Sequence, residues 1–255
     1  GRGSRIRYLV PTPTARDRML SYGVQPGNIV VTGFPLPPSL ESRAETTLER
    51  RVDRLTGIRS SGVRDADTIP RLTFAVGGAG AQAERGRQLL RALVQPLRAG
   101  ALRMTLVAGT RPRLAARFRQ WSAAEIGSDW SRAVEVLEAD SFGSYYRRFN
   151  SLLEHTDVLW TKPSELVFYA ALGLPLVLDD PVGAHEKRNA QWVIDAGAGR
   201  FRPPVARIWP DVERWFADGT LAECAQSGFA GLPRGGASAI TNECSIPLNK
   251  DLTAG

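Results

Sequence analysis

Three glycines stand close together in the segment VGGAGAQ at 76–82, between an apolar run and an amphipathic stretch. In such a loop, backbone N–H groups and the positive end of a helix can bind phosphate, and glycine permits the close approach because it has no Cβ. Gly77, Gly78 and Gly80 are therefore candidate phosphate-binding residues. The segment has neither the lysine followed by Ser or Thr of a Walker loop nor the GxGxxG spacing of dinucleotide-binding folds. A tight turn without a ligand explains the glycines equally well.

A polar turn, TKPSE at 161–165, follows a second apolar run and leads into a predicted helix at 164–172. Lys162, Ser164 and Glu165 would then lie at the carboxyl end of a parallel strand, where open α/β sheets bind their ligands. The alternative interpretation is structural, with Ser164 as the N-cap and Glu165 as a first-turn carboxylate that suits the helix dipole.

The segment DDPVGAHEKRNAQWVIDAGAG at 179–199 gathers polar side chains at the start of another predicted helix. His185 and Asn189 are four residues apart, so they lie on one helix face and could contact the same polar ligand. An ordinary solvated helix start is the alternative. We interpret Asp179 and Asp180 as strand-end and cap residues. The sequence shows no Ser-His-Asp order, metal-ligand spacing or paired catalytic carboxylates, which argues against a hydrolase or a metal site.

Apolar runs and amphipathic stretches alternate regularly from residue 71 to residue 196. Alternation of this kind predicts parallel strands joined by crossover helices, that is, a doubly wound, Rossmann-like α/β domain. Strands are expected at 72–76, 102–109, 133–137, 158–161 and 174–178, and helices are expected through 97, at 112–122, up to 155, at 164–172 and at 185–196.

Four regions follow from these patterns. Residues 1–35 form one predicted β-α-β step, which is too small to hold a core by itself. Residues 36–70 are expected to be a linker, extended at the prolines of GFPLPPSL, followed by a helix. Residues 71–231 form the predicted ligand-binding domain, and 232–255, rich in Gly, Ser, Ala and Asn, are expected to be a loosely ordered tail. The chain begins with glycine, and we expect it to be a piece of a larger protein.

The chain has 255 residues and a net charge of +7, and only three of its 33 basic residues are lysines. The arginines are dispersed and do not form the basic stripe with aromatics that a nucleic-acid binder shows. No run approaches the roughly 20 apolar residues of a membrane-spanning helix. The two cysteines lack metal-ligand spacing, so a cytoplasmic location with both thiols reduced is the default expectation.

In chain order, four segments resemble the C-terminal, donor-binding domain of GT-B glycosyltransferases of family 28. They are VTGFPLPPSL at 31–40, FAVGGAGAQ at 74–82, TDVLWTKPSELVFYAALGLPLVL at 156–178 and HEKRNAQWVIDAGAG at 185–199. The pattern is most similar to the peptidoglycan N-acetylglucosaminyltransferases and the diglyceride glucosyltransferases. The ordered set is far more specific than any single segment.

The resemblance implies a role for each candidate. The donor diphosphate would meet the glycine loop, the nucleotide and sugar would face the turn after residue 161, and the sugar hydroxyls would contact the start of the last helix. The implied donor-binding residues are Gly77, Gly78 and Gly80; Lys162, Pro163, Ser164 and Glu165; and His185, Glu186 and Asn189. Phe168 departs from the family, which has at this position the glutamate that holds the ribose hydroxyls. Glu165, about one helical turn earlier, is the candidate replacement.

The implied function is transfer of a hexose, N-acetylglucosamine or glucose, from a UDP-sugar to a lipid or glycan acceptor. The transfer would be inverting, without metal or cofactor, and would rely on positioning and on N–H groups that neutralise the leaving diphosphate. The acceptor site and the catalytic base are implied to lie in the N-terminal acceptor domain, of which residues 1–35 would be the end. Two alternatives remain open: an inactive nucleotide-sugar-binding module and a sugar-nucleotide epimerase of the same architecture. A further hypothesis, from the positive charge, is peripheral association with the anionic inner face of the cell membrane.

Overall fold

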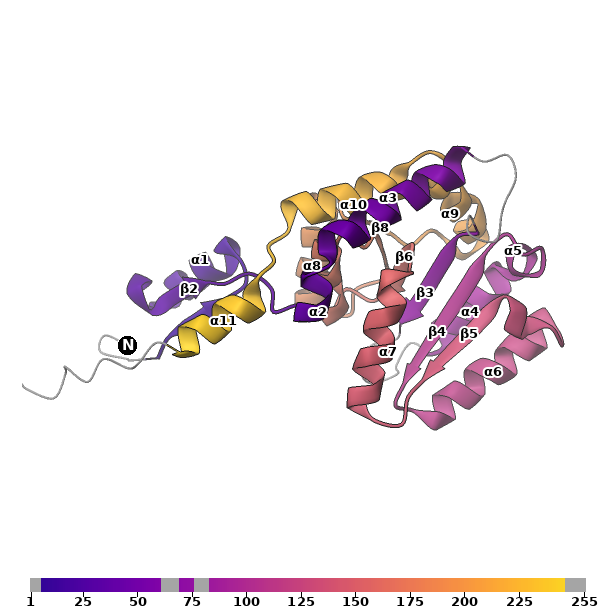
Figure 1. Ribbon diagram of the computed structural model, residues 1–255, viewed down its shortest axis with the longest axis horizontal. Coiled ribbons are helices and arrows are strands. Elements are labelled where there is room, and N and C mark those ends of the chain that lie inside the picture. The colour runs from indigo at the N-terminus through magenta and orange to yellow at the C-terminus, as the bar shows by residue number, and fades with distance from the viewer. Residues whose placement is uncertain (1–5, 61–68, 76–82, 246–255) are drawn as a thin grey trace, which may run out of the picture. The chain divides into compact units, whose positions relative to one another are not determined.

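The computed structural model describes residues 6–60, 69–75 and 83–245. The chain divides into two compact units, which Figure 1 draws and which are treated separately below. Unit 1 comprises residues 1–43 and 233–255, and unit 2 is continuous from Ala44 to Leu232. The glycine loop at 76–82 lies outside the described residues.

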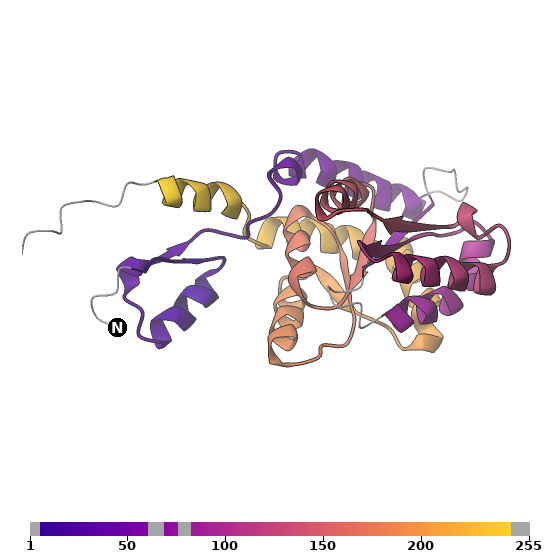
Figure 2. The same cartoon turned by 90° about the horizontal axis from the view of Figure 1, so that it is seen from below.

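Unit 1 contains a two-stranded parallel sheet. Strands β1 (Tyr8–Val10) and β2 (Ile29–Val31) pair in register and are joined through helix α1 (Pro13–Ser21) and the 3₁₀ turn η1 (Pro26–Asn28). Helix α1 packs along the strands (Figure 2). It begins where the sequence favours a start, because Pro13 occupies the first turn and the Thr12 hydroxyl accepts the Ala15 N–H at 3.1 Å.

Two further helices belong to unit 1. The proline segment predicted as an extended connector contains the short helix α2 (Pro38–Glu41), which Pro38 starts because proline is tolerated in the first turn. The expectation of a loosely ordered tail does not hold for helix α11 (Gly236–Ser245). Contacts within unit 1 decide this: the Gly235 N–H donates to the Glu41 carboxylate at 2.6 Å, and Glu243 pairs with Arg7. A Cβ on Gly236 would stand 2.4 Å from the Phe34 carbonyl carbon, so only glycine permits this approach.

Unit 2 is built on a six-stranded parallel sheet with the strand order β5-β4-β3-β6-β7-β8. Its strands are β3 (Arg71–Ala75), β4 (Arg103–Gly109), β5 (Val134–Glu138), β6 (Val158–Thr161), β7 (Leu176–Leu178) and β8 (Gly199–Phe201). This is the order of the doubly wound Rossmann sheet, and it confirms the predicted fold class. The order reverses between β3 and β6, so the topological switch point lies at the carboxyl ends of these two strands.

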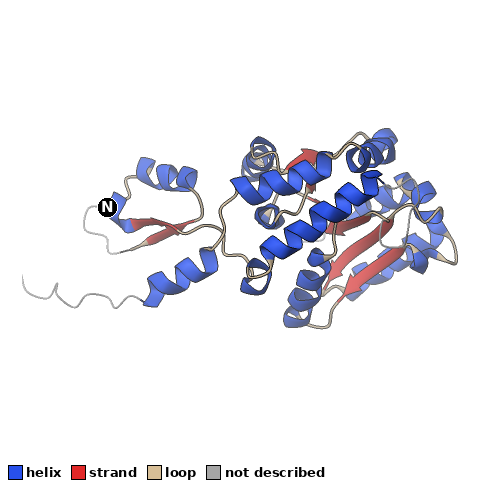
Figure 3. Ribbon diagram, turned by 45° about the horizontal axis from the view of Figure 1, so that its top comes forward, coloured by secondary structure: helices blue, strands red, loops and turns tan. Residues whose placement is uncertain are grey.

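Helices cover both faces of the sheet (Figures 1 and 3). Side chains of β3 alternate: Leu72 and Phe74 point into the main core, where they meet α4 and α6, whereas Thr73 points to the other face. The helices of unit 2 are α3 (Ala44–Ser60), α4 (Ala83–Ala92), α5 (Val94–Arg98), α6 (Pro112–Ile126), α7 (Phe142–Glu154), α8 (Ala184–Asp195), α9 (Ile208–Ala217) and α10 (Thr220–Gly231), with 3₁₀ segments η2 (Trp130–Arg132), η3 (Glu165–Leu172) and η4 (Val205–Arg207).

The segment after β6 differs from its predicted form. The expected α-helix at 164–172 is the 3₁₀ segment η3, which Gly173 ends in the left-handed conformation with φ of 69°. A side chain at Gly173 would meet Leu48 of α3 at 2.5 Å. The strand expected from residue 174 begins only at Leu176, because the two residues after Gly173 lead the chain out of the turn.

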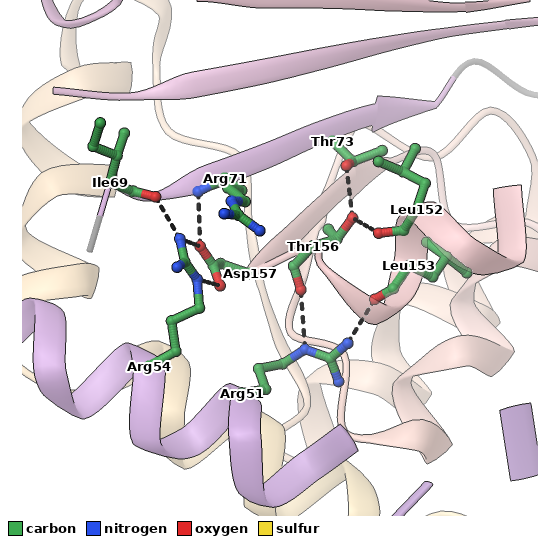
Figure 4. A network of polar contacts seen from close by, with 9 residues as sticks. All are labelled: Arg51, Arg54, Ile69, Arg71, Thr73, Leu152, Leu153, Thr156 and Asp157. Carbon is green, nitrogen blue, oxygen red and sulfur yellow. Dashed lines mark hydrogen bonds and ion pairs between the residues drawn. The ribbon is translucent and has the colours of Figure 1, made fainter. Parts of the chain in front are cut away.

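A buried arginine on α3 ties together the ends of two other elements, and Figure 4 shows its contacts at the first of them, the end of α7. Arg51 donates to the carbonyls of Leu153 at 2.7 Å and Thr156 at 3.0 Å, at the end of α7. It also donates to the carbonyls of Leu172 at 3.3 Å and Gly173 at 2.9 Å, at the end of η3. Burial lowers the pKa of Arg51 to about 10, so the guanidinium is still charged at neutral pH. Arg51 thereby supplies hydrogen-bond donors to carbonyls at the ends of these two elements, where intrahelical donors run out.

One turn further along α3, Arg54 forms a fork with Asp157. Its Nε lies 2.7 Å from Oδ1 and its Nη2 lies 3.1 Å from Oδ2 of the carboxylate, which also accepts the backbone N–H of Arg71 at 2.7 Å. This bidentate geometry fixes α3 to the amino ends of β3 and β6.

Candidate functional site

The carboxyl ends of β3 and β6 form the floor of the candidate site. The Thr161 hydroxyl at the end of β6 donates to the carbonyl of Ala75, the last residue of β3, at 3.3 Å. The two segments singled out from the sequence therefore leave the sheet side by side at the switch point. The roles of Gly77, Gly78 and Gly80 in the first segment remain predictions, since these residues lie outside the described part of the chain.

Lys162 and Glu186 are joined by an ion pair across the site. The Lys162 ammonium lies 2.7 Å from Oε1 of Glu186, which is 2% exposed and belongs to the first turn of α8. The second carboxylate oxygen of Glu186 accepts the backbone N–H of Val182 at 2.7 Å. The turn after β6 and the loop before α8 are thus held together by one buried carboxylate.

A second contact links the same two segments. The Asn189 amide donates to the carbonyl of Pro163 at 3.2 Å, one helical turn beyond Glu186. His185 lies on the rim: its side chain is 75% exposed, and its Nε2 is 3.9 Å from the Glu186 carboxylate. The structure therefore brings together Lys162, Pro163, His185, Glu186 and Asn189, as the sequence segments suggest.

Ser164 and Glu165 occupy the N-cap and the first turn of η3, as in their structural interpretation, but the capping bond expected of Ser164 is not formed. Ser164 precedes η3, but its hydroxyl forms no capping bond, and the buried oxygen has no hydrogen-bond partner within the described chain. Glu165 is exposed. Ser164 thus presents an unpaired buried hydroxyl beside Lys162.

Phe168 packs against an aromatic side chain of α8. Its ring lies 6.4 Å from that of Trp192 in an edge-to-face arrangement. The position at which the resembling family carries a ribose-binding glutamate is here part of an apolar contact between η3 and α8.

An aromatic group near Glu165 was not anticipated from the sequence. Tyr145 of α7 stacks on Phe149, with ring centroids 5.5 Å apart. Burial raises the pKa of the Tyr145 hydroxyl to about 12; Tyr146 and Glu165 add to the rise, and Arg111 opposes it. Tyr145 therefore lies within electrostatic reach of both Glu165 and Arg111 at the carboxyl edge of the sheet.

The consecutive aspartates after β7 bind arginines. Asp179 is fully buried, and its Oδ1 lies 3.1 Å from Nε of Arg85 in the first turn of α4 and 2.9 Å from Nε of Arg202 after β8. Asp180 pairs with the same two arginines, and the N-cap of α8 is Gly183, so neither aspartate caps that helix. Burial raises the pKa of Asp179, and Arg85 and Arg202 oppose this rise only in part. The helix that follows the glycine loop is thereby anchored to β7.

Two features are absent from the described ranges. Residues 6–60, 69–75 and 83–245 contain no group of three or more His, Cys, Asp or Glu side chains arranged to hold a metal ion. Within the same ranges, no helix has the length and apolar character needed to cross a membrane.

Sequence comparison relates the chain to glycosyltransferases. No protein-family model matches it. It is 24% identical over 194 residues to a processive diacylglycerol beta-glucosyltransferase of Bacillus pumilus, a match over 75% of this chain and 44% of that protein. It is 23% identical over 220 residues to the chloroplastic monogalactosyldiacylglycerol synthase of Spinacia oleracea, a match over 82% of this chain and 37% of that protein. The chain thus spans less than half the length of these relatives.

Solved structures share the fold. A putative UDP-N-acetylglucosamine 2-epimerase from Listeria monocytogenes has a TM-score of 0.61 at 15% identity, covering 94% of this chain and 58% of that one. The UDP-GlcNAc 2-epimerase from Neisseria meningitidis, bound to UDP-GlcNAc, has a TM-score of 0.57 at 12% identity, over 93% and 59%. At these identities the likeness shows the fold alone.

The sheet order defines a doubly wound, Rossmann-like α/β domain with its candidate site at the topological switch point. Within that class, the sequence matches confirm the resemblance to GT-B glycosyltransferases related to family 28, among them the diacylglycerol glucosyltransferases.

The buried carboxylate of Glu186 is expected to make the stability of the protein sensitive to acid. Burial alone would raise the pKa of Glu186, but hydrogen bonds from Lys162 and Val182 and the charge of Lys162 hold it below its ordinary value of 4.5. A depressed pKa in the folded state means that this stabilisation is present above the unfolded-state pKa and is lost as the pH falls through the folded-state pKa. The free energy of unfolding, measured with denaturant at about pH 7 and about pH 3, should therefore fall less on acidification in Glu186→Gln than in the unmodified chain. Equal losses in both proteins would contradict the assignment.

Proposed function

We propose that this chain carries the donor-binding part of a glycosyltransferase that moves a hexose from a UDP-sugar to an acceptor. The observation that carries the proposal is the frame formed by Lys162, Glu186, Asn189 and Pro163 at the switch point of the sheet. Open α/β sheets bind ligands at this place. The relatives that match the sequence include a diacylglycerol beta-glucosyltransferase and a monogalactosyldiacylglycerol synthase.

Each residue has a proposed role in holding the donor. Gly77, Gly78 and Gly80 bind the diphosphate through backbone N–H groups. Lys162, whose side chain is 28% exposed, keeps N–H donors for the ligand beyond the one it gives to Glu186. The unpaired hydroxyl of Ser164 binds the nucleotide. The exposed carboxylate of Glu165 accepts hydrogen bonds from the ribose hydroxyls, the role that the resembling family gives to a glutamate at the position of Phe168.

The sugar end is proposed to lie at the start of α8. His185 and Asn189 share a helix face, and the exposed imidazole of His185 can reach sugar hydroxyls. Catalysis then consists of orientation of the donor and stabilisation of the leaving diphosphate by fixed N–H groups. In the inverting reaction that we propose, the acceptor and the catalytic base come from a preceding domain.

A lipid is the acceptor that we favour over a soluble glycan. A diacylglycerol glucosyltransferase and a galactolipid synthase are among the relatives of the chain. The net charge of +7 suits approach to an anionic membrane surface at which such a lipid would be presented. Co-sedimentation with vesicles that depends neither on anionic lipid nor on salt would count against this part of the proposal.

Ligand-induced stabilisation tests the donor assignment. We expect UDP and UDP-hexoses, more than GDP or dTDP conjugates, to raise the melting temperature; a donor at 100 times its dissociation constant adds about 2.7 kcal/mol. His185→Ala and Asn189→Ala should weaken the response to UDP-sugars. Gln191→Ala is the matched control, since Gln191 is exposed on the same helix and bonds only locally to Asp195. A folded protein that responds to no nucleotide would instead favour the inactive-module alternative.

A sugar-nucleotide epimerase is the second candidate, because UDP-GlcNAc 2-epimerases share the fold over most of this chain. Incubation of the protein, together with its preceding domain, with UDP-GlcNAc and no acceptor separates the two functions. Formation of the C2 epimer, followed by NMR, would replace the transferase proposal, whereas sugar transfer only on addition of a lipid acceptor would exclude the epimerase.

A further inference from the structure

A groove runs along β3, β4 and β5 on the side of the sheet that carries α7, and at the β5 edge it is also lined by Arg119 of α6. In Figure 1 these strands are seen with α4 and α6 behind them and α7 to one side. The groove has a volume of about 800 Å³ and is bordered by the strands, by α7 and by the η2 turn before β5. It contains none of the donor-site residues proposed above.

The groove has a strong excess of positive charge. The described residues that line it include five arginines and one histidine but a single carboxylate, that of Glu135. The arginines are Arg71, Arg103, Arg119, Arg132 and Arg148. Arg119 and Arg132 also pair with Glu138 and Asp129, respectively, and the side chain of Arg132 is 84% exposed.

Three of these arginines stand in a row because of the strand register. Arg71 and Arg103 are the first residues of β3 and β4 and are paired across the two strands. The pairing of Met104 with Val134 places Arg132 just before the matching end of β5. Neighbouring strands are about 4.8 Å apart, and like charges opposite one another destabilise a sheet. An anion bound between Arg71 and Arg103 would neutralise the like charges that the register places opposite one another.

The adjoining cavity shows that this excess is local. It measures about 420 Å³, shares Arg71, His155 and Thr156 with the groove, and is also lined by Asp53, Glu154 and Asp157. Its arginines are thus balanced by carboxylates. Of these two neighbouring cavities, the groove is the one that combines several guanidinium groups with a single carboxylate.

The chemistry of the lining fits phosphate groups. Guanidinium groups bind phosphate oxygens with two parallel N–H bonds, which makes arginine better suited than lysine for this purpose. The hydroxyls of Thr105, Ser131 and Ser151 add further potential donors along the groove. By contrast, the Thr73 and Thr156 hydroxyls bond to each other at 2.8 Å and close the floor.

We propose that this groove binds an anion that carries two or more phosphate groups, as a second site distinct from the donor site. The separation follows from the topology: the arginine row marks the amino ends of the strands, whereas Lys162 and Glu186 lie at their carboxyl ends. One site can therefore be altered without change to the other.

Titration of the full chain with inorganic tripolyphosphate tests the proposal. UDP is added at saturation beforehand so that the glycine loop is occupied, and ionic strength is held constant. We expect Arg103→Gln combined with Arg132→Gln to weaken tripolyphosphate binding by about tenfold or more, since each charged hydrogen bond is worth about 1.5–3 kcal/mol. Arg91→Gln is the matched control, because Arg91 is an exposed arginine of α4 that does not line the groove. The affinity of Arg91→Gln for tripolyphosphate should stay within about twofold of that of the unmodified chain.

Several outcomes separate the explanations. Equal weakening in the control and in the double variant, or no loss in the double variant, would overturn the proposal. Because Arg132 is highly exposed, Arg132→Gln alone serves as the test if the double variant fails to fold. The response to UDP-sugars should be the same in the groove variants and the unmodified chain, so failure of the donor assignment is recognised independently. Vesicles with cardiolipin, a lipid whose headgroup carries two phosphate groups, compared with free tripolyphosphate, show whether the phosphate groups come from a lipid headgroup or from solution.

Discussion

Replacement of Arg51 by methionine is expected to lower the free energy of unfolding of unit 2 by about 3–5 kcal/mol. Methionine fills much of the space of the arginine stem but donates no hydrogen bond. The carbonyls of Leu153, Thr156, Leu172 and Gly173 would each lose a hydrogen-bond donor, and the Arg51 side chain that supplies it is only 5% exposed. Denaturant unfolding followed by circular dichroism measures the loss.

Arg50 provides the matched control for this change. It is the preceding residue on α3, is exposed, and forms a long hydrogen bond of 3.5 Å to Thr47. Arg50→Met should change the free energy of unfolding by less than about 0.5 kcal/mol. If the two variants were equally stable, the four carbonyl contacts would not be the reason for burial of Arg51.

Replacement of Lys162 by methionine is expected to have the largest effect on the candidate site itself. The Glu186 carboxylate is 2% exposed and would keep only the Val182 N–H as a partner. Since Lys162 is 28% exposed, part of its charge is screened by solvent, and we expect a cost of about 2–3 kcal/mol in unfolding free energy. UDP-sugar affinity should fall by about tenfold or more, because the turn at 161–165 is no longer held to α8.

A double-mutant cycle separates stability from ligand binding in this pair. Glu186→Leu with Lys162→Met removes the unpaired carboxylate and should recover much of the lost stability, because a buried ion pair can be replaced by apolar side chains at little cost. The affinity for the UDP-sugar should remain low in the double variant. Recovery of both properties together would show that Lys162 serves the fold alone. Lys187→Met, an exposed lysine of α8, is the control for loss of charge.

The architecture could be predicted because the sequence patterns are local. Each core strand of unit 2 up to β7 is a short apolar run, and each crossover helix is amphipathic, so the parallel sheet and its ligand-binding edge follow directly. The segments that carry Lys162, His185 and Asn189 could be placed at that edge for the same reason. The strand β8 and the helices α9 and α10 follow a region in which no clear alternation guided the prediction.

Pairings between distant residues could not be predicted in this way. Glu186 is 24 residues from Lys162 in the sequence, and Arg51 is more than 100 residues from Leu153. Nothing in the local sequence pattern therefore marks Arg51 or Glu186 as a buried residue. The two consecutive aspartates after β7 were a signal, but only the folded chain shows that Arg85 and Arg202 converge on them. The composition of 236–245 indicates a weak helix former, and tertiary contacts within unit 1 override that tendency.

The division of the chain has a consequence for the order in which the protein is made. Unit 2 is one continuous stretch, whereas unit 1 is assembled from residues on both sides of it. Domains fold as units while synthesis proceeds from the N-terminus. Residues 6–43 leave the ribosome before unit 2, yet α11 and the Gly235 and Glu243 contacts that complete their unit are translated only after Leu232. During biosynthesis, unit 1 can therefore reach its final structure only after the whole of unit 2 has been translated.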